Sequence, residues 1–441
     1  MQDWNERTIF DPAELGAYLR ERRKKLGYTQ RDVADFNQCS LRFVSELERG
    51  KAGCQSSPNP SKSLTAWGVD LILRERGDGL MALKVYREYR GTFELVGEFE
   101  RADPVNETFA YDEGYLERDD AAALSASLPL RHEPYASNEF SAFFSGMLPE
   151  GPVRHELSMR FQIPQSDYLS MLERLGDECV GALRFLGDEK SSYDPGYRPL
   201  QDEDFEALSK AEVFEIANDM QDSRLSLAGA QSKTGWFLPR GKDAKKAGSG
   251  DWMLPLGSAP STHIVKIAST KHPDLPFNEL ICMTAASAAG LEIARSEASD
   301  TIPGAFFSER YDRIWSNEPP SMSGFDVPLR LHQEDFCQAV GWPSYMKYET
   351  RPDSCYMALC GRLIREQSSN VIADTQMFAR QVMVDYALGN CDSHLKNHSF
   401  LYSPSWREKR LAPAYDIVCT TIMGYDHNLG IDIGDHRVID G

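Results

Sequence analysis

The sequence lacks the patterns of a secreted, disulfide-rich or membrane-spanning protein. Its nine cysteines are scattered and odd in number, and they form no CxxC pair. This argues against a disulfide framework or a zinc ribbon and favours a reducing compartment. The opening stretch MQDWNERTIFDP is charged and has no apolar core, so we do not expect a signal peptide. No uninterrupted apolar run reaches the ~18 residues that a spanning helix needs. We therefore expect a cytoplasmic protein that makes no membrane contact.

Positive charge is also scarce. The 441 residues include 48 Lys and Arg against 67 Asp and Glu, which gives a net charge of −19. The overall field of such a chain does not favour contact with nucleic acid, so any DNA contact requires a local basic patch. The length predicts two or three domains, and a hydrophobic content of 41% is ordinary for a globular protein with real cores.

Residues 12 to 50 supply such a basic patch. The stretch AELGAYLRERRKKLG has helical spacing and a basic surface from Arg20 to Lys25. Next come TQRDVADFN, with Thr29 as a plausible N-cap, and CSLRFVSELERGK, a short helix that begins near Ser40. Three short helices with tight connections and positive charge are typical of a helix-turn-helix. The alternative is a basic, solvated helix in a small bundle.

The combination TQRDVA…SLRFVSELERGK resembles the Xre/Cro-type family of DNA-binding domains. The resemblance implies operator contacts by Gln30, Ser40, Arg42, Phe43 and Ser45, with Arg49 on phosphate. The later stretch LTAWGVDLILRERGD resembles the closing helix and strand of a HipB-type antitoxin, so we expect an all-α DNA-binding domain over residues 12–77. Such domains usually read two half-sites as dimers. A homodimer and a separate HipB-type antitoxin are both open as partners.

A new pattern begins at Met81. In MALKVYREYRGTFELVGEFER, apolar positions alternate around a YRG turn, which predicts a β-hairpin. Residue 81 therefore resembles the start of a separate protein, and we expect that two adjacent genes merged, with an engineered fusion as the alternative. Residues 106–220 predict only an α+β domain. Within it we expect Glu150 and Asp177 to be helix-terminal or turn carboxylates.

Two weak signals open the second half. RLSLAGAQSKTGWFL carries a run of small residues whose backbone N–H groups could approach phosphate, although for this stretch alone a plain hairpin turn is the better explanation. STHIVKIA predicts a strand with one lysine, Lys266. A strand lysine that follows a phosphate loop binds nucleotide in kinases. An edge-strand lysine that faces water is an equal alternative.

The segment GNCDSHLKNHSF, residues 389–400, crowds ionisable groups between a predicted helix and a predicted strand. Asp392 and Asn397 are spaced as the Asp and Asn of the kinase catalytic loop are, and Asp416 in LAPAYDIV is expected at a strand end, where kinases hold metal. His394 and His398 are four apart but lack the Glu of HExxH, which disfavours zinc. We expect His394 and Lys396 to be supporting donors near phosphate instead.

Residues 81–441 resemble the HipA family of serine/threonine protein kinase toxins. The motifs that carry the resemblance are LSASLPL, FFSGMLPEG, SLAGAQSKT, THIVK, ERYDR, LHQEDFCQAVG, GNCDSHLKNHSF and LAPAYDIV, in that order. The resemblance implies a multidomain chain: the all-α helix-turn-helix domain, then an α+β, two-lobed, protein-kinase-like domain. The latter would comprise an N-terminal subdomain, 81–220, and a kinase core, 221–441.

The resemblance also assigns roles to residues. The loop that would cradle the ATP phosphates is Ala228, Gly229, Ala230, Gln231, Ser232 and Lys233. Lys266, His394, Lys396 and Tyr415 would bind nucleotide as well, and Glu334, Asp335 and Phe336 would form the adenine hinge. Asp392 would be the catalytic acceptor, with Asn397 and Asp416 holding Mg²⁺. Ser226 would be the autophosphorylated serine, whose modification ejects the phosphate loop.

In function, the resemblance implies a bacterial ATP- and Mg²⁺-dependent serine/threonine protein kinase toxin. Its target would be glutamyl-tRNA synthetase, with arrested translation, growth arrest and persistence as the result. Family members continue beyond the position of Gly441, so we expect a shortened C-lobe. The covalent DNA-binding module would restrain the toxin at an effective concentration of ~mM. The alternatives are a DNA-binding regulator with an inactive kinase half, and a small-molecule or lipid kinase.

Overall fold

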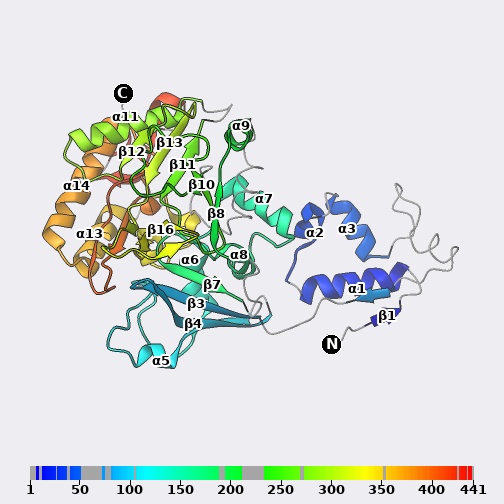
Figure 1. Cartoon of the computed structure of the whole chain (residues 1–441). Coiled ribbons are helices and arrows are strands. Elements are labelled where there is room, and N and C mark those ends of the chain that lie inside the picture. Colours follow the sequence, from blue (N-terminus) through cyan, green and yellow to red (C-terminus); the bar gives the residue numbers. More distant parts are fainter. Residues whose placement is uncertain are drawn as a thin grey trace.

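The computed structural model shows a small helical unit beside a larger body (Figure 1). It describes residues 6–8, 12–25, 27–36, 40–50, 72–74, 81–103, 106–187, 194–210, 233–268, 273–350, 354–424, 427–434 and 436–439. The predicted phosphate-loop residues Ala228–Ser232 and the predicted modification site Ser226 lie outside the described residues.

Helices lie at the three predicted places in the N-terminal unit: α1 (Pro12–Lys25), α2 (Gln30–Phe36) and α3 (Leu41–Glu48). The Ser40 hydroxyl caps α3 by accepting a hydrogen bond from the Phe43 backbone N–H at 3.1 Å. Gly16 lets α1 approach the end of α3, because a Cβ at that position would lie 2.5 Å from the carbonyl oxygen of Leu47. A short antiparallel pair, β1 (Glu6–Thr8) and β2 (Ile72–Arg74), joins two distant parts of the sequence.

The helical unit contacts the larger body through α2, which lies beside α7 (Gly151–Phe161) (Figure 1). Tyr28, just before α2, lies near Asp167 of the larger body. Burial raises the pKa of the Tyr28 phenol, and the negative charge of Asp167 on the body raises it further. The two parts of the chain are therefore packed against each other as well as joined by the chain between them.

A five-stranded antiparallel sheet forms the base of the body, in the order β6-β5-β4-β3-β7. The predicted hairpin is confirmed: β3 and β4 pair around Arg90 and Gly91, whose φ angles of 53° and 83° suit a tight two-residue turn. The sheet and its helices are β3 (Met81–Tyr89), β4 (Thr92–Asp103), β5 (Asn106–Tyr111), β6 (Tyr135–Ala136), β7 (Leu183–Leu186), α5 (Glu113–Leu116), α6 (Ser137–Ser145), α7 and α8 (Tyr168–Leu175).

A second antiparallel sheet has the order β12-β13-β11-β9. Its strands are β9 (Thr234–Trp236), β11 (His263–Ile267), β12 (Ser296–Ala298) and β13 (Ala305–Glu309), and α11 (Leu275–Ala288) packs on β12 and β13. Trp236, Trp252 and Phe307 fill a separate core on this sheet. Around it lie β8 (Gly196–Pro199), α9 (Asp202–Lys210), β10 (Met253–Leu256), β14 (Arg313–Ile314), β15 (Ser321–Met322), β16 (Phe325–Asp326) and β17 (Leu329–Arg330).

The remaining part is mainly helical. Its elements are β18 (Gln333–Asp335), α12 (Phe336–Ala339), η1 (Ser344–Met346), α13 (Tyr356–Gln367), α14 (Val371–Leu388), η2 (Leu395–Asn397), β19 (Ser399–Tyr402), β20 (Lys409–Leu411), η3 (Thr421–Met423), β21 (Asn428–Ile433) and β22 (His436–Val438). None of the described helices combines the length and the apolar character needed to cross a membrane.

One hydrophobic core runs from the five-stranded sheet into this helical part. Phe99 and Phe144 of the sheet region belong to the same buried cluster as Phe336, Ile364 and Leu395. The predicted N-terminal subdomain therefore shares its core with the segment that carries the predicted catalytic residues.

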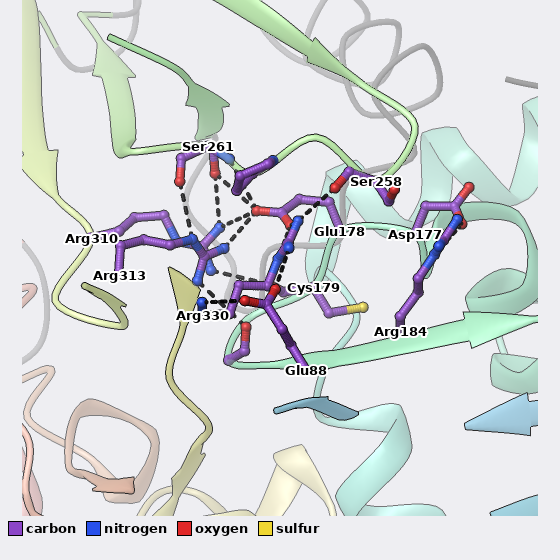
Figure 2. A network of polar contacts seen from close by, with 12 residues as sticks. Glu88, Asp177, Glu178, Cys179, Arg184, Ser258, Ser261, Arg310, Arg313 and Arg330 are labelled. Atoms are coloured by element: carbon purple, nitrogen blue, oxygen red, sulfur yellow. Dashed lines mark hydrogen bonds and ion pairs between the residues drawn. The ribbon is translucent and has the colours of Figure 1, made fainter. Parts of the chain in front are cut away.

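A buried cluster of ion pairs connects the two sheets (Figure 2). Glu178, in the loop between α8 and β7, accepts from Arg310 at 3.1 Å, from Arg313 at 2.6 Å and from Arg330 at 2.6 Å. Arg330 also reaches Glu88 of β3 at 2.6 Å, and Arg310 reaches Asp312 at 2.8 Å. Three guanidinium groups and three carboxylates thus balance in charge, as buried ions must.

We expect Glu178→Gln to lower the free energy of unfolding by about 3–5 kcal/mol, because it leaves three buried arginines with two carboxylates. The measurement is urea denaturation at pH 7, with Glu100→Gln on the exposed surface of β4 as the control. An equal effect of both substitutions would contradict this account of the cluster.

The contribution of Glu178 should depend on pH. Burial opposes the ionised carboxylate, but the three arginines outweigh burial and lower its pKa from 4.5 to about 2. Because the folded-state pKa is lowered, the stabilisation is present above pH 4.5 and is lost as pH falls towards about 2. Denaturation curves from pH 7 to pH 3 should therefore show the wild-type advantage over Glu178→Gln shrinking only below about pH 4.5.

Candidate active site

Lys266 lies at the centre of a buried charge cluster. It projects from β11, which has neighbours on both sides in its sheet, so the alternative of an edge-strand lysine is wrong. Its Nζ contacts both carboxylate oxygens of Glu279, at 2.7 and 2.8 Å, and Oδ1 of Asp416 at 2.5 Å. One ammonium group therefore joins strand β11, helix α11 and the segment around residue 416.

The charges in this cluster influence one another strongly. Burial opposes the ionised form of Asp416, but the cations Lys266 and Lys233 outweigh it and hold the pKa of that carboxyl well below its usual range. Burial lowers the pKa of the Lys233 amine, and Asp416 acts in the opposite direction. Lys233, the last residue of the predicted phosphate loop, therefore lies close to this cluster. Two cations beside one ionised carboxylate suit the binding of phosphate and metal together.

Glu279 is a site residue that the sequence analysis missed. It is fully buried on α11, the helix that follows the lysine strand. Burial raises its pKa, Lys266 lowers it, and the charge of Asp416 raises it again. A lysine–glutamate ion pair between a strand and the next helix holds the nucleotide-binding lysine of protein kinases in place. The signal was available, because Glu279 is the only acidic residue in the apolar helical stretch LPFNELICMTAASA.

The predicted catalytic segment follows α14, which ends at Gly389 with a φ of 73°. Asp385, in the last turn of α14, accepts hydrogen bonds from Asn390 and Ser393, both at 2.8 Å. Burial raises the pKa of Asp385 to about 6. Polar groups on both sides of Asp392 therefore hold the turn that contains it, which explains part of the crowding of polar residues in this segment.

Asp392 is presented close to the charge cluster. Its Oδ1 accepts a hydrogen bond from the Tyr348 hydroxyl at 2.5 Å. Burial raises the pKa of Asp392, the bond from Tyr348 lowers it, and the charge of Asp416 raises it. Asn397, the last residue of η2, is buried a few residues further on. The structure thus brings Lys266, Asp392 and Asp416 into one region.

Asp416 lies in an irregular segment rather than at a strand end, because β20 stops at Leu411. Its φ of 61° is left-handed, an uncommon conformation for a residue other than glycine. Such strained positions occur mainly where function constrains the backbone. Nearby, the Tyr415 ring stacks on Tyr311 with centroids 5.5 Å apart, and its hydroxyl donates to the Lys396 carbonyl oxygen at 2.8 Å.

Lys396, which was predicted to be a supporting donor near phosphate, contacts groups of the protein itself. Its ammonium group contacts Glu150 at 3.0 Å, Asp335 at 3.5 Å and the carbonyl oxygen of Gly146 at 3.1 Å. Glu150 also pairs with Lys347 at 3.0 Å, and these two lysines outweigh burial and lower its pKa to about 2. Lys396 is therefore occupied in joining the catalytic segment to the start of α7. Glu150 does stand at a helix terminus, as expected.

The two histidines are buried and neutral. Burial lowers the pKa of His394 to about 3 and that of His398 to about 4. His398 packs against Phe336 and Phe378, whereas His394 meets the edge of the Tyr348 ring with centroids 4.9 Å apart. Among the described residues, no group of three or more His, Cys, Asp or Glu side chains could hold a metal ion. His394 therefore fits a packing role beside Asp392.

The predicted hinge at residues 334–336 is not where the lysine-bearing sheet ends. The Glu334 carboxylate is fully buried and accepts from Ser125, from Tyr402 and from Lys409. Phe336 is in the main core, and β18 pairs with β19 in a different sheet from Lys266. The adenine hinge should directly follow the sheet that carries the phosphate-binding lysine. A single nucleotide contacts the hinge with its adenine and the lysine with its phosphates. This geometry argues against an adenine-binding role for 334–336.

One oxygen donor suited to Mg²⁺, the carboxylate of Asp416, lies beside Lys266 and Lys233. Asp416 is ionised, and Asn397 adds an amide oxygen from the catalytic segment, which is the hard-donor chemistry that Mg²⁺ prefers. Because Mg²⁺ retains several water ligands, one or two protein oxygens are enough. Asn397 and Asp416 therefore fit the predicted metal-holding role in their chemistry.

The predicted DNA-contacting residues divide into two groups. Within the helical unit, the Gln30 side chain donates to Glu48 at 2.8 Å, Ser40 caps α3, and Arg49 donates to the Ser45 carbonyl and hydroxyl oxygens, both at 2.9 Å. Arg42 and Phe43 are exposed on α3, with Arg42 also paired to Glu46 at 3.0 Å. The exposed surface that α3 offers to a partner is thus centred on Arg42 and Phe43.

We expect Lys266→Met to destabilise the fold by about 3–5 kcal/mol at pH 8, because it leaves two buried carboxylates without their shared cation. Without Lys266 the folded-state pKa of Glu279 should rise further, so that protonation relieves the repulsion at lower pH. The loss of stability should therefore be smaller at pH 5 than at pH 8. Urea denaturation at both values, beside the exposed Lys246→Met, checks this. An effect of Lys266→Met that is independent of pH would contradict it.

Comparison with known protein families agrees with this architecture. The HipA N-terminal domain matches residues 92–186, and the HipA-like C-terminal domain matches residues 225–439. The protein Y4mE of Sinorhizobium fredii is 32% identical over 336 residues, which cover 74% of this chain and 75% of that protein. The serine/threonine-protein kinase toxin HipA of Shewanella oneidensis is 26% identical over 359 residues, or 77% of each chain. The helices α1 to α3 lie outside both domain matches.

A solved structure shows the same fold. The toxin–antitoxin complex of HipA, HipB and operator DNA from Shewanella oneidensis MR-1 contains a chain that aligns with a TM-score of 0.62. The alignment has 23% identity and covers 81% of this chain and 80% of that one. The two sheets, the lysine strand and the predicted catalytic segment therefore belong to an α+β fold of the HipA type. Together, the domain matches and the similarity to Y4mE show that this chain is a member of the HipA family of kinases.

Proposed function

We propose that the chain is an ATP- and Mg²⁺-dependent serine/threonine protein kinase of a toxin–antitoxin system. The observation that carries the proposal is the position of Lys266 between Glu279 and Asp416, close to Asp392. Phosphoryl transfer is catalysed mainly by positioning and by charge, and these residues offer the lysine, its glutamate partner, the metal-holding Asp and the acceptor-orienting Asp.

Each of these residues would have a separate task. Lys266, held by Glu279, would donate to phosphate oxygens of ATP, and Lys233 would add a second positive charge. Asn397 and Asp416 would hold Mg²⁺, which supplies neutralisation of the phosphate charge. Asp392 would orient the acceptor hydroxyl and accept its proton as the oxygen bonds to the γ-phosphorus, while ADP leaves.

The adenine hinge is better placed at residues 309–311 than at 334–336. Strand β13 is hydrogen-bonded to the lysine strand β11 along its length, and it ends at Glu309. The next residues leave this sheet, and the ring of Tyr311 lies against Tyr415, next to Asp416. The segment 309–311 therefore runs from the strand beside Lys266 to the region of Asp416. A nucleotide bound along it could place its adenine at this segment and its phosphates near Lys266.

The helical unit would bind operator DNA through α3 and would repress the promoter of its own gene. The exposed Arg42 and Phe43 and the basic last turn of α1 support this role. By analogy with the HipA–HipB–operator complex, a separate HipB-type antitoxin or a second copy of the chain would complete the repressor. The cellular target proposed for the kinase is glutamyl-tRNA synthetase, with arrest of translation as the result.

An inactive kinase half that serves only a DNA-binding regulator is the alternative. It receives less support, because an inactive site has no need to keep a buried lysine, its glutamate and two aspartates in one region. A small-molecule kinase would use the same phosphate chemistry and differs only in its acceptor, so the acceptor test below separates the two.

Asp392→Ala should reduce transfer of γ-phosphate by at least ~10³-fold, because the acceptor hydroxyl loses its orienting and proton-accepting group. The measurement is transfer of labelled phosphate from Mg²⁺-ATP to glutamyl-tRNA synthetase. The exposed Asp194→Ala serves as the control, and operator binding should be unchanged in both variants. Equal transfer by Asp392→Ala and wild type would refute the assignment. Transfer to a small acceptor alone would favour the small-molecule kinase.

Arg42→Ala should weaken binding to the promoter DNA of the gene by about 10- to 100-fold, as expected for a base-contacting arginine. Arg240→Ala, which removes the same charge outside the helical unit, should leave binding within about twofold. Fluorescence anisotropy at fixed salt measures both, since charge effects on DNA binding depend on salt. An unchanged affinity of Arg42→Ala for this DNA would contradict the proposal that α3 contacts the bases.

A further inference from the structure

The hydroxyl group of Tyr348 is hydrogen-bonded to Asp392, the residue that would bind the acceptor hydroxyl in the proposed mechanism. The bond from Tyr348 Oη to Asp392 Oδ1 is 2.5 Å long, which is within the short range of a hydrogen bond to an ionised oxygen. A serine or threonine hydroxyl that is about to be phosphorylated must also reach a carboxylate oxygen of Asp392. While Tyr348 is bonded to Oδ1, an acceptor hydroxyl cannot take the same position on that oxygen.

The backbone on both sides of Tyr348 is fixed. Lys347 pairs with Glu150 at 3.0 Å, and its carbonyl oxygen accepts from the Leu395 N–H at 3.2 Å. Glu349 accepts from the backbone N–H of Tyr356 and of Asp432, both at 3.0 Å. The contacts of Lys347 and Glu349 therefore hold Tyr348 beside Asp392.

The side chain itself is placed so that it can move. Tyr348 is 37% exposed, whereas its neighbour Lys347 is 9% exposed. Its ring meets His394 edge-on, with centroids 4.9 Å apart, and the Lys347 ammonium lies 5.3 Å from the ring centroid. Rotation about its own side-chain bonds, with the backbone still anchored, would release the bond to Asp392 and carry the ring towards solvent.

From this geometry we infer that Tyr348 is an internal stand-in for the acceptor hydroxyl, which the substrate must displace from Asp392. Tyr348 would then set how readily an acceptor, or water, reaches the proton-accepting oxygen. It is a positioning residue that acts through Asp392, and this inference rests on the proposed kinase function.

The test uses Tyr348→Phe, which keeps the ring and removes only the hydroxyl, in the full chain. The control is Tyr345→Phe, three residues earlier in the same segment and 84% exposed. Release of ADP from Mg²⁺-ATP is measured without acceptor and with dephosphorylated β-casein at increasing concentration, and Asp392→Ala provides the background. Urea denaturation of each variant confirms that the fold is kept.

If Tyr348 competes with the acceptor, Tyr348→Phe should raise acceptor-independent ADP release and lower the KM for casein. The size expected for removing one competing hydrogen bond to a charged group is about tenfold. The kcat and the KM for ATP should stay within about twofold of wild type. The acceptor-independent rate decides the outcome if casein is not phosphorylated.

Three results would overturn the inference while leaving the kinase proposal intact. A lower kcat at unchanged KM would mean that Tyr348 holds Asp392 during the chemistry. Behaviour equal to Tyr345→Phe would mean that the contact is only structural. Phosphate found on Tyr348 by peptide mapping would mean that it is itself an acceptor. Absence of any Asp392-dependent ADP release in all variants would instead overturn the proposed function, and this inference with it.

Discussion

The fold depends on the requirement that the buried Glu178 carboxylate be matched by cations from other parts of the chain. Glu178 belongs to the N-terminal subdomain, and the arginines that neutralise it follow β13 or lie in β17. None of these ions could be buried alone, since an unpaired charge in the interior costs several kcal/mol. The two sheets are therefore held in one relative position. The segment that follows β13 and leads to Tyr311, beside Tyr415, is held with them.

The same principle operates at the catalytic segment. Lys396 is neutralised by Glu150 at the start of α7, and Glu334 accepts a hydrogen bond from Ser125 in the segment between α5 and β6. Because the hydrophobic core is also continuous between these parts, the N-terminal subdomain supports the candidate active site and is not a separately packed domain. The N-terminal helical unit lies against this subdomain through the contact of α2 with α7. A change at that contact would therefore reach α7, whose first turn adjoins Glu150.

Local sequence patterns predicted the elements well, and long-range pairing was harder to predict. The hairpin at Met81, the strand of Lys266 and the strand after residue 398 are confirmed, since each depends on alternation or turn residues within a few positions. The partners of buried charges were not predictable in this way. Lys396 contacts Gly146, 250 positions earlier in the chain, and Glu334 contacts Ser125, 209 positions earlier. Nothing in their local sequence distinguishes these two residues from phosphate or adenine ligands. Glu279 is conspicuous as the one acidic residue of the apolar stretch LPFNELICMTAASA, but no spacing in the sequence connects it with Lys266.

The central claim is that Asp392, supported by Lys266 and Asp416, transfers phosphate from ATP. Mass spectrometry of the purified chain after incubation with Mg²⁺-ATP, beside Asp392→Ala, tests it most directly. The account predicts added phosphate in the wild type alone, mapped to Ser226 in the sequence that precedes Lys233. Folded wild-type protein without added phosphate, or equal phosphate on Asp392→Ala, would contradict the account.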